Sequence, residues 1–334
     1  MSLTLRPIER EVWQDFQQSI PKGSLFHRWE WQDIIEAGFG LQVRRLGLFD
    51  QAGNLRGLLP LAERKMSLLK LAGSPLSGTA TPHSGHAGDV PLDEVLQALE
   101  IYAAEKHIDY LEISLPSLSG REIFEQNGYT VTELQTLDLP MPANEEALWA
   151  GLEVRCRNAV RKAEKSGVEV FEPQTLEEWL EPYYELSCGV YRRQEKEPPF
   201  SRDYFTALWQ NLFECGDLTV LLARYQGAII AGGIFPRDRE VAYYLDGVSD
   251  REYNKVVPNN LVQWEYLKRA QAMGISLYDM VGANIPSIAK FKKSFGSIER
   301  TYLYAYRNRT LAARVGRTVY AKHGETIKKF LKRS

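Results

Sequence analysis

The stretch from Leu218 to Gly296 carries strand and helix signals in a fixed order, and this order limits the folds open to the chain. Two short apolar runs, Leu218–Arg224 and Ala228–Phe235, flank the turn pair Gln226-Gly227 and predict a β-hairpin. A strand, a helix that ends at Gly274 and a second strand follow the hairpin. We place these three elements at Val241–Asp246, Leu261–Met273 and Ser276–Val281. Together they predict a compact α/β unit.

A fainter copy of the same pattern lies earlier in the chain. Its hairpin consists of the strands Val43–Phe49 and Leu55–Leu61 with a turn at Gly53-Asn54. Its helix is Val95–Lys106, and its final strand is Tyr110–Leu115. We interpret the repeat as an internal duplication. The copies differ after a shared phenylalanine, where Lys292 follows Phe291 but Glu125 follows Phe124. Chemistry that needs a cation at this position is therefore expected in the second copy.

The length of the chain, 334 residues, is sufficient for two domains of ordinary size. The stretch Pro140–Asn144 marks the predicted boundary between them. We therefore expect an N-terminal domain over residues 1–140, a C-terminal domain over 141–306 and a basic, helical tail over 307–334.

The composition excludes several classes of protein. A formal net charge of −2 argues against general binding to nucleic acid or to a strongly acidic partner. The three cysteines, Cys156, Cys188 and Cys215, are odd in number and lack metal-ligand spacing, which favours reduced thiols and a cytoplasmic protein. The sequence shows neither a signal-peptide core nor an apolar run of membrane-spanning length.

His83 and His86 form a His-x-x-His pair that could bind a metal ion. They lie in the loop Ser74–Gly88, which is rich in Gly, Ser, Pro and Thr and offers only Asp89 as a nearby third ligand. We therefore favour a solvated or cleft-lining loop, and we predict no metal site.

A basic helix is predicted over residues 144–166, directly after the domain boundary. Arg157, Arg161 and Lys165 are spaced four residues apart and share one face, and Arg155 lies close to them. Two interpretations remain open. The residues could form an ordinary solvated face, or Arg155, Arg157 and Arg161 could contact the phosphate or diphosphate of a substrate.

The tail after Arg307 is strongly basic and has apolar residues that could line one side of a helix. These apolar residues are Leu311, Val315, Val319, Ile327, Phe330 and Leu331. Such a helix could touch an anionic membrane surface, which would place the protein at the inner face of the membrane. It could equally pack on the body of the protein or fray.

Several motifs of the second half match one known family. They are Ala231-Gly232-Gly233, Tyr243-Tyr244, Asp246-Gly247, Pro258-Asn259-Asn260-Leu261, Tyr278-Asp279, Gly282 and Phe291-Lys292-Lys293-Ser294-Phe295-Gly296. Through them the chain resembles the GNAT-type acyltransferase domain of the Fem (FemAB/FemX) peptidyltransferase superfamily. The resemblance extends to about Arg307 and is denser in the second half. It implies an α/β fold of two tandem GNAT-like domains, each a mixed, mostly antiparallel sheet flanked by helices, with an interdomain cleft.

The resemblance also implies transfer of an acyl or aminoacyl group to an amine of a cell-envelope precursor. In Fem enzymes the donor is an aminoacyl-tRNA and the acceptor belongs to a small-molecule or lipid-linked peptidoglycan precursor. An exopolysaccharide precursor is also compatible. The chain lacks the charged coiled-coil segment of FemA-type members, and Arg251–Pro258 lacks the glycines with which GNAT enzymes hold the pyrophosphate of acyl-CoA. Aminoacyl-tRNA and acyl-CoA (or acyl-carrier protein) therefore both remain open as donors, no tightly bound cofactor is expected, and the rival function is a non-catalytic precursor-binding protein.

Acyl transfer to an amine passes through an oxyanion and needs a route for the proton of the amine. No Ser/His/Asp or Cys/His arrangement is evident in the sequence, so we expect direct attack by the amine. The Fem-type Phe-Lys pair falls on Phe291-Lys292, which implies that Lys292 stabilises the oxyanion or contacts the donor; the alternative is a surface lysine. Asp279 ends a predicted strand, where it could accept the proton, orient the amine or cap the next turn.

Further substrate contacts are expected from Tyr244, Asn259, Asn260 and Phe291. Tyr243 and Tyr244 alternate across a strand, so only one of them can face the cleft. Asn259 and Asn260 precede the predicted helix, so one is expected to cap it and the other to bind the donor.

Overall fold

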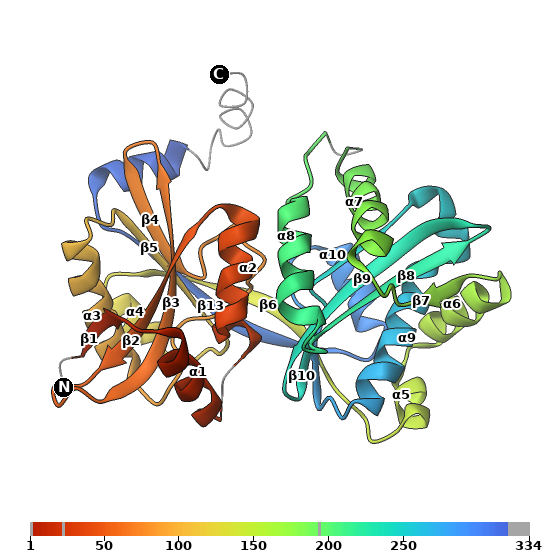
Figure 1. The fold of residues 1–334 in the computed structure, drawn as a ribbon, viewed down its shortest axis with the longest axis horizontal. Helices are drawn as coiled ribbons and strands as arrows, with labels where there is room; N and C mark the ends of the chain where they lie inside the picture. Colours follow the sequence, from red (N-terminus) through yellow and green to blue (C-terminus); the bar gives the residue numbers. More distant parts are fainter. Residues whose placement is uncertain (1–2, 22–23, 193–194, 320–334) are drawn as a thin grey trace. The chain divides into compact units, whose positions relative to one another are not determined.

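The computed structural model describes residues 3–21, 24–192 and 195–319, and the chain divides into two compact units (Figure 1). The first unit combines Met1–Gly23, Leu41–Glu133 and Tyr302–Ser334, and the second combines Ser24–Gly40 and Leu134–Thr301. Both units are built from chain segments that are distant in sequence. This division differs from the predicted contiguous domains 1–140 and 141–306.

Two segments account for the difference. Helix α2 (Trp29–Phe39) belongs to the second unit because it packs against α8 (Arg202–Leu208). The helices approach so closely that a Cβ atom on Gly38 would lie 2.7 Å from the Cβ atom of Tyr204. The second segment is the end of strand β13 (Ile298–Asn308), which belongs to the first unit because Leu303–Asn308 pairs with β5 (Tyr110–Leu115).

The sheet of the first unit has the strand order β1-β2-β3-β4-β5-β13. The strands β4 and β5 are parallel, and the other described pairs are antiparallel. The helix α3 crosses over from β4 to β5 and buries Val95, Leu96 and Leu99. The remaining elements of this unit are β1 (Thr4–Pro7), α1 (Arg10–Ser19), β2 (Gln42–Phe49), β3 (Leu55–Met66), β4 (Leu69–Ser74), α3 (Leu92–Glu105), α4 (Arg121–Gln126) and a helix over residues 311–319.

The sheet of the second unit has the strand order β6-β12-β10-β9-β8-β7, with β11 paired to β9. Only β10 and β12 are parallel among its described pairs. The strands are β6 (Thr130–Pro140), β7 (Glu169–Phe171), β8 (Leu218–Tyr225), β9 (Ala228–Asp238), β10 (Val241–Tyr243), β11 (Asp246–Ser249) and β12 (Leu277–Asp279). The longer helices are α5 (Glu145–Gly151), α6 (Val154–Lys165), α7 (Leu176–Arg192), α9 (Pro258–Ala272) and α10 (Pro286–Lys293).

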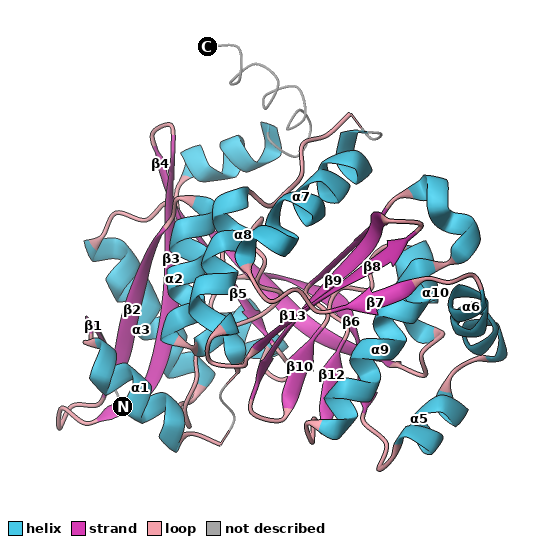
Figure 2. Cartoon of the chain, turned by 45° about the vertical axis from the view of Figure 1, so that its right-hand side comes forward, coloured by secondary structure: helices cyan, strands magenta, loops and turns pink. Residues whose placement is uncertain are grey.

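Helices cover both faces of this second sheet (Figure 2). Gly232 and Gly233 are successive residues of β9, so their Cβ directions point to opposite faces. A Cβ atom on Gly232 would lie 2.9 Å from Tyr183 of α7, whereas one on Gly233 would lie 3.3 Å from Val262 of α9. The glycines therefore allow α7 and α9 to press on the strand from opposite sides.

The predicted duplication agrees with the topology of the two units. Each contains an antiparallel hairpin, a third strand, a crossover helix and a strand parallel to the third. The predicted single helix over 144–166 is wrong, because Leu152 adopts an extended backbone and separates α5 from α6. None of the described helices has the length and apolar character required to cross a membrane.

Candidate active site

The parallel strands β10 and β12 separate at one point, and the candidate site lies there. The two strands pair from Val241 opposite Leu277 to Tyr243 opposite Asp279. The backbone N–H of Tyr244 still donates to the carbonyl of Asp279 at 2.9 Å. The following strand, β11, pairs with β9 instead. The carboxyl ends of parallel strands at such a split are a usual place for ligands in α/β sheets.

Lys292 extends from the last turn of α10 into this split. Its side chain is buried, with 7% of the residue exposed, so the surface-lysine alternative is wrong. Its Nζ donates hydrogen bonds to the carbonyls of Val281 and Gly282, the second at 3.0 Å, and lies 5.4 Å from the centre of the Tyr244 ring. Burial lowers the pKa of Lys292 to about 8, and the carboxylates of Asp279 and Asp246 partly offset that effect.

The carboxylate of Asp279 accepts three hydrogen bonds from its surroundings. Its Oδ1 accepts from the Thr136 hydroxyl at 2.6 Å and from the Val281 N–H at 2.8 Å. Its Oδ2 accepts from the Arg300 guanidinium at 2.9 Å. These three hydrogen bonds occupy most of the acceptor positions of the carboxylate, so a positioning role fits Asp279 better than the predicted role of proton acceptor. Asp279 instead anchors the turn after β12.

Val281 sits at the centre of that turn in an unusual conformation. Its φ of +50° lies in the left-handed region, which a β-branched residue rarely adopts. Two hydrogen bonds hold it there. The N–H of Val281 donates to the carboxylate of Asp279, and its carbonyl accepts from the ammonium group of Lys292. The strain directs the Val281 carbonyl at the ammonium group.

Asp246 is a second carboxylate at the split, and it was not among the residues predicted for the site. It opens β11 and is half-buried, and its Oδ2 accepts a hydrogen bond from the buried Tyr183 hydroxyl at 2.7 Å. Burial raises the pKa of Asp246, while the Tyr183 hydrogen bond and the charge of Lys292 act in the opposite direction. Its signal in the sequence was its place in the Asp246-Gly247 motif, two residues beyond Tyr244.

The two tyrosines between β10 and β11 have different environments. Tyr243 is buried with its ring 4.8 Å from that of Phe26 and belongs to the core. Tyr244 is half-buried, stacks 5.7 Å from Phe235 and faces Lys292. A Cβ atom on Gly247 would lie only 1.9 Å from the Tyr244 hydroxyl, so the absence of a side chain there makes room for the ring.

The predicted capping role of Asn259 and Asn260 is wrong. Helix α9 begins at Pro258, three residues before the predicted start at Leu261, and Val257 is its N-cap. Asn259 donates to the Ser249 hydroxyl at 2.9 Å, and Asn260 contacts the sulfur of Cys156 at 3.6 Å. Both side chains thus connect α9 to its neighbours, and no described contact links either of them to Lys292.

Phe291 lies on α10, and the three predicted arginines, Arg155, Arg157 and Arg161, lie on α6. The Phe291 ring packs at 5.2 Å against Phe295. Arg155 pairs with Glu153 at 2.6 Å and donates to the Lys290 carbonyl, while Arg157 donates to backbone carbonyls at the end of α5. These contacts fix the side chains of Arg155 and Arg157, and their binding to a phosphate stays a prediction.

Arg161 contributes to an open surface pocket in the second unit. Its guanidinium lies 5.1 Å from the centre of the Trp149 ring, which meets the ring of Trp264 edge to face at 4.8 Å. The pocket has a volume of about 580 Å³. It is lined by Glu145, Glu146, Trp149, Arg161, Glu164 and Trp264.

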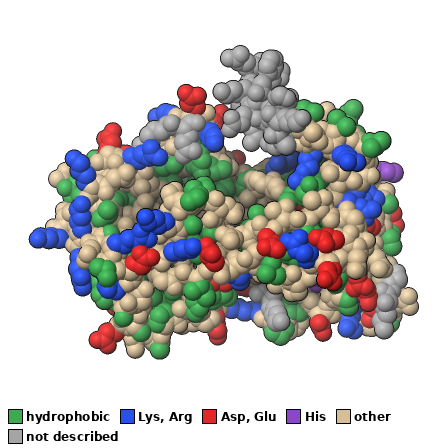
Figure 3. Space-filling view, turned by 180° about the vertical axis from the view of Figure 1, so that it is seen from behind, with side chains coloured by type: hydrophobic (Ala, Val, Ile, Leu, Met, Phe, Trp, Pro, Cys, Tyr) green, Lys and Arg blue, Asp and Glu red, His purple; other side chains and the backbone are tan. Residues whose placement is uncertain are grey.

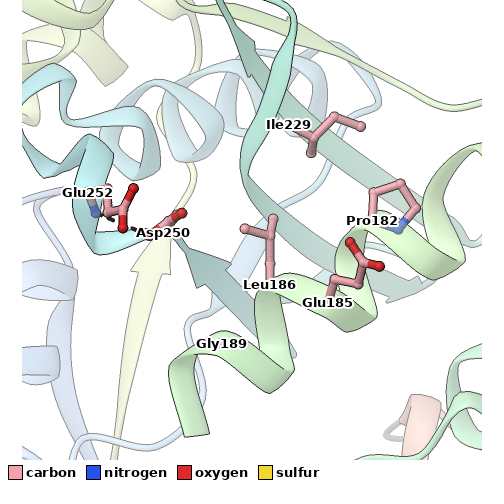
Figure 4. A pocket seen from close by; sticks show the side chains of 7 residues that line it. All are labelled: Pro182, Glu185, Leu186, Gly189, Ile229, Asp250 and Glu252. Carbon is pink, nitrogen blue, oxygen red and sulfur yellow. Dashed lines mark hydrogen bonds between the residues drawn. The ribbon is translucent and has the colours of Figure 1, made fainter. Parts of the chain in front are cut away.

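A second pocket of about 530 Å³ lies between α7, β9 and the short helix Arg251–Val256 (Figure 4). Glu185 and Leu186 of α7 face it from one side, and Asp250 and Glu252 from the other. Asp250 accepts from the backbone N–H of Glu252 at 3.1 Å. None of the residues predicted for the site lines this pocket.

The histidine pair in the loop Ser74–Gly88 has protein partners. His83 is buried with its ring 5.6 Å from that of Tyr302, and Nε2 of His86 lies 3.1 Å from the Val90 carbonyl. Across the described residues, no group of three or more His, Cys, Asp or Glu side chains is arranged to hold a metal ion.

Residues 154–293 match the family described as acetyltransferase (GNAT) domain, and this range contains the strand split and Lys292. The matched region lies within the second unit. It contains the parallel pair β10–β12, the crossover helix α9, and Lys292, Asp246 and Asp279.

Solved structures extend this likeness to about nine tenths of the chain. The crystal structure of FemX has a TM-score of 0.68 and 19% identity, over 90% of this chain and 96% of that one. A tandem GNAT protein from the clavulanic acid biosynthesis pathway has a TM-score of 0.58 and 10% identity, over 92% and 99% of the two chains. L-PGS from Bacillus licheniformis has a TM-score of 0.57 and 14% identity, over 92% and 94%. The predicted tandem GNAT fold and the resemblance to Fem proteins are confirmed.

One curated relative matches in sequence. Lipid II:glycine glycyltransferase from Staphylococcus haemolyticus (strain JCSC1435) is 33% identical over 69 residues. The matched region is 20% of this chain and only 16% of that protein.

Proposed function

We propose that the protein transfers an acyl or aminoacyl group to an amine of a cell-envelope precursor, by direct attack of the amine. The observation that carries the proposal is the buried ammonium of Lys292, held at the split of a GNAT sheet by the carbonyls of Val281 and Gly282. A buried lysine costs free energy and is retained most readily where a charge is needed. This cost argues against the rival function of a non-catalytic binding protein.

In the proposed reaction, the nitrogen of the acceptor attacks the carbonyl carbon of the donor and forms a C–N bond. The carbonyl oxygen becomes an oxyanion, and Lys292 stabilises that negative charge. Asp246 accepts the proton of the attacking amine, because it is a second carboxylate at the split and lies within the field of Lys292. Collapse of the intermediate breaks the carbon–oxygen or carbon–sulfur bond to the leaving group, which takes up a proton.

The donor is an aminoacyl-tRNA or an acyl-CoA, and neither requires a tightly bound cofactor. The segment Arg251–Val256 forms a short helix followed by Val257 with φ +47°, in place of a glycine loop for a pyrophosphate. This favours aminoacyl-tRNA. Acyl-CoA remains the second candidate because the second unit is a GNAT domain.

The acceptor we propose is a peptidoglycan precursor, with an exopolysaccharide precursor as the alternative. Support comes from the FemX fold and from the stretch shared with a lipid II:glycine glycyltransferase. A lipid-linked acceptor resides in a membrane, so a peripheral contact between the enzyme and the inner membrane surface is part of the proposal. Arg155, Arg157 and Arg161 are candidates for its diphosphate.

A direct assay tests this function. The purified chain is incubated with a lipid-linked or nucleotide-linked peptidoglycan precursor and either a charged tRNA pool or acetyl-CoA, and the precursor is analysed by mass spectrometry. We expect a mass increase of one acyl or aminoacyl group with one donor, and none with the Lys292→Ala variant. Substrate binding without any mass increase would favour the binding-protein function instead.

A further inference from the structure

The helix over residues 311–319 has its apolar face turned outward. Leu311 and Val315 are 79% and 63% exposed, and Val319 is also exposed. These residues are spaced four apart and form one stripe along the helix. A helix on the surface of a globular protein normally presents the opposite arrangement, with its apolar stripe toward the core.

The other face of this helix holds it on the first unit. Ala313 is buried, and a Cβ atom on Gly316 would lie 3.1 Å from the side chain of Leu69. The Arg317 guanidinium lies 3.2 Å from the centre of the Tyr306 ring and donates to the Tyr110 hydroxyl. With about 100° of rotation per residue, Ala313 and Arg317 lie opposite the stripe of Leu311, Val315 and Val319. Packing therefore fixes the outward direction of the stripe.

The turn between β3 and β4 adds a further exposed apolar residue beside the helix. Leu68 is 91% exposed and follows Ser67, which has a φ of +55°. Turns of this kind favour Gly, Asn and Asp, so a fully exposed leucine is an unusual choice. Leu68 directly precedes Leu69, against which the helix packs, and both views show the helix beside the end of β4 (Figures 1 and 2).

Two basic side chains belong to the same hairpin and the same helix as these apolar groups. Lys65 and Arg314 are exposed, and neither forms an ion pair among the residues that the structure describes. Hydrophobic side chains gather at this end of the first unit in the space-filling view (Figure 3). Beyond residue 319 the sequence adds Lys322, Lys328, Lys329, Lys332 and Arg333 against a single Glu325.

We propose that Leu68, Leu311, Val315 and Val319 form a docking surface for an anionic lipid bilayer. Apolar side chains that enter the interface, together with basic groups that meet anionic headgroups, are the combination that binds peripheral proteins to such membranes. A second copy of the chain would require complementary acidic groups, whereas the residues beside this surface are basic. The proposal concerns binding alone and does not depend on the catalytic activity.

Vesicle co-sedimentation with the full chain tests the proposal. We expect binding to vesicles of phosphatidylcholine with phosphatidylglycerol, weaker binding at high salt and weaker binding to pure phosphatidylcholine. The triple variant Leu68→Ser, Leu311→Ser, Val315→Ser should reduce the partition coefficient about tenfold or more, because it removes the apolar contacts. Val12→Ser is the matched control, since Val12 is 46% exposed on α1 of the same unit and should bind as the unmodified protein does.

Three outcomes would overturn the proposal. The unmodified chain could fail to bind anionic vesicles, or the triple variant could bind as strongly as the Val12→Ser control. In the third outcome, light scattering would show that the unmodified chain is a dimer and the triple variant a monomer. The surface would then join two copies of the chain. Thermal unfolding of each variant verifies that it is folded, which is expected because all the substituted side chains are exposed. If the unmodified chain binds vesicles but transfers no acyl group, the proposed function is rejected and the proposed docking surface is still supported.

Discussion

Asp279 and Lys292 bind the two backbone groups of the same residue, Val281. Asp279 accepts from the N–H of Val281, and Lys292 donates to the carbonyl of that residue. Val281 is held at a φ of +50° between them. Asp279 is thus a positioning residue for the ammonium group, whereas Lys292 is the candidate catalytic residue.

Replacing Lys292 by alanine should reduce turnover by about 100-fold or more, because the cation that stabilises the oxyanion is lost. Lys293→Ala is the matched control. Lys293 is the next residue on α10, is exposed and pairs with Glu299 at 2.6 Å. Steady-state kinetics with the substrates from the transfer assay measure both variants. Equal, small losses would remove Lys292 from the mechanism.

Turnover should fall as the pH rises through about 8. Lys292 must be protonated to stabilise an oxyanion, and burial lowers its pKa to about 8. A pH–rate profile of kcat from pH 6 to 10 measures this limb. A rise in turnover over the same range would instead indicate that neutral Lys292 acts as a base.

The stability of the protein should also depend on Lys292 at alkaline pH. Between pH 8 and 10.5 the folded chain has a neutral Lys292, while the unfolded chain keeps that lysine protonated. The unfolded state then binds more protons, so the free energy of unfolding rises with pH across this window, by on the order of 3 kcal/mol in total. Lys292→Met should lack this rise in urea unfolding at successive pH values. A similar rise in both proteins would assign it to other groups.

Asp246→Asn should lower turnover by about 100-fold, because an amide cannot accept the proton of the amine. Glu185→Gln is the control, since Glu185 is an exposed carboxylate of the pocket on the same helix as Tyr183. Both variants can be compared by kcat and KM. If Glu185→Gln loses as much turnover as Asp246→Asn, the pocket of Figure 4 receives the amine and Asp246 does not accept its proton.

Asp279→Asn should destabilise the protein by about 2 kcal/mol, because it weakens a charge-assisted hydrogen bond from the half-buried Arg300, which keeps Asp138 as a partner. It should also move the alkaline limb of the pH–rate profile to lower pH, since the charge of Asp279 raises the pKa of Lys292. Calorimetry and the pH profile measure the two effects. A uniform loss of turnover at every pH, with normal stability, would restore Asp279 as a proton acceptor.

The sequence predicted the duplicated α/β pattern because hairpin turns and apolar runs are local signals. It also selected Lys292, since one copy has a lysine and the other a glutamate at matching positions. It could not distinguish Asp279 from Asp246. Their difference depends on Thr136 and Arg300, which meet Asp279 only in the folded sheet. Burial of Lys292 is likewise a tertiary property that no spacing reveals.

The boundary between the units was beyond prediction for a related reason. Patterns along a chain favour contiguous domains, whereas α2 packs on α8 about 170 residues later in the sequence. The N-cap of α9 was also predicted incorrectly. Two asparagines are good caps, but Pro258 fits the first turn of a helix and moves the start upstream.

The exchange of segments between the units has a consequence for synthesis on the ribosome. The second unit needs Ser24–Gly40 from the beginning of the chain and continues to Thr301. The first unit cannot complete its sheet until Leu303–Asn308 has been made to pair with β5. Both units must therefore wait for almost the whole chain, and a partly made chain exposes β5 as an open strand edge. Gene fragments cut at residue 140 should yield insoluble products from both halves, whereas only the intact reading frame supplies each unit with all of its parts.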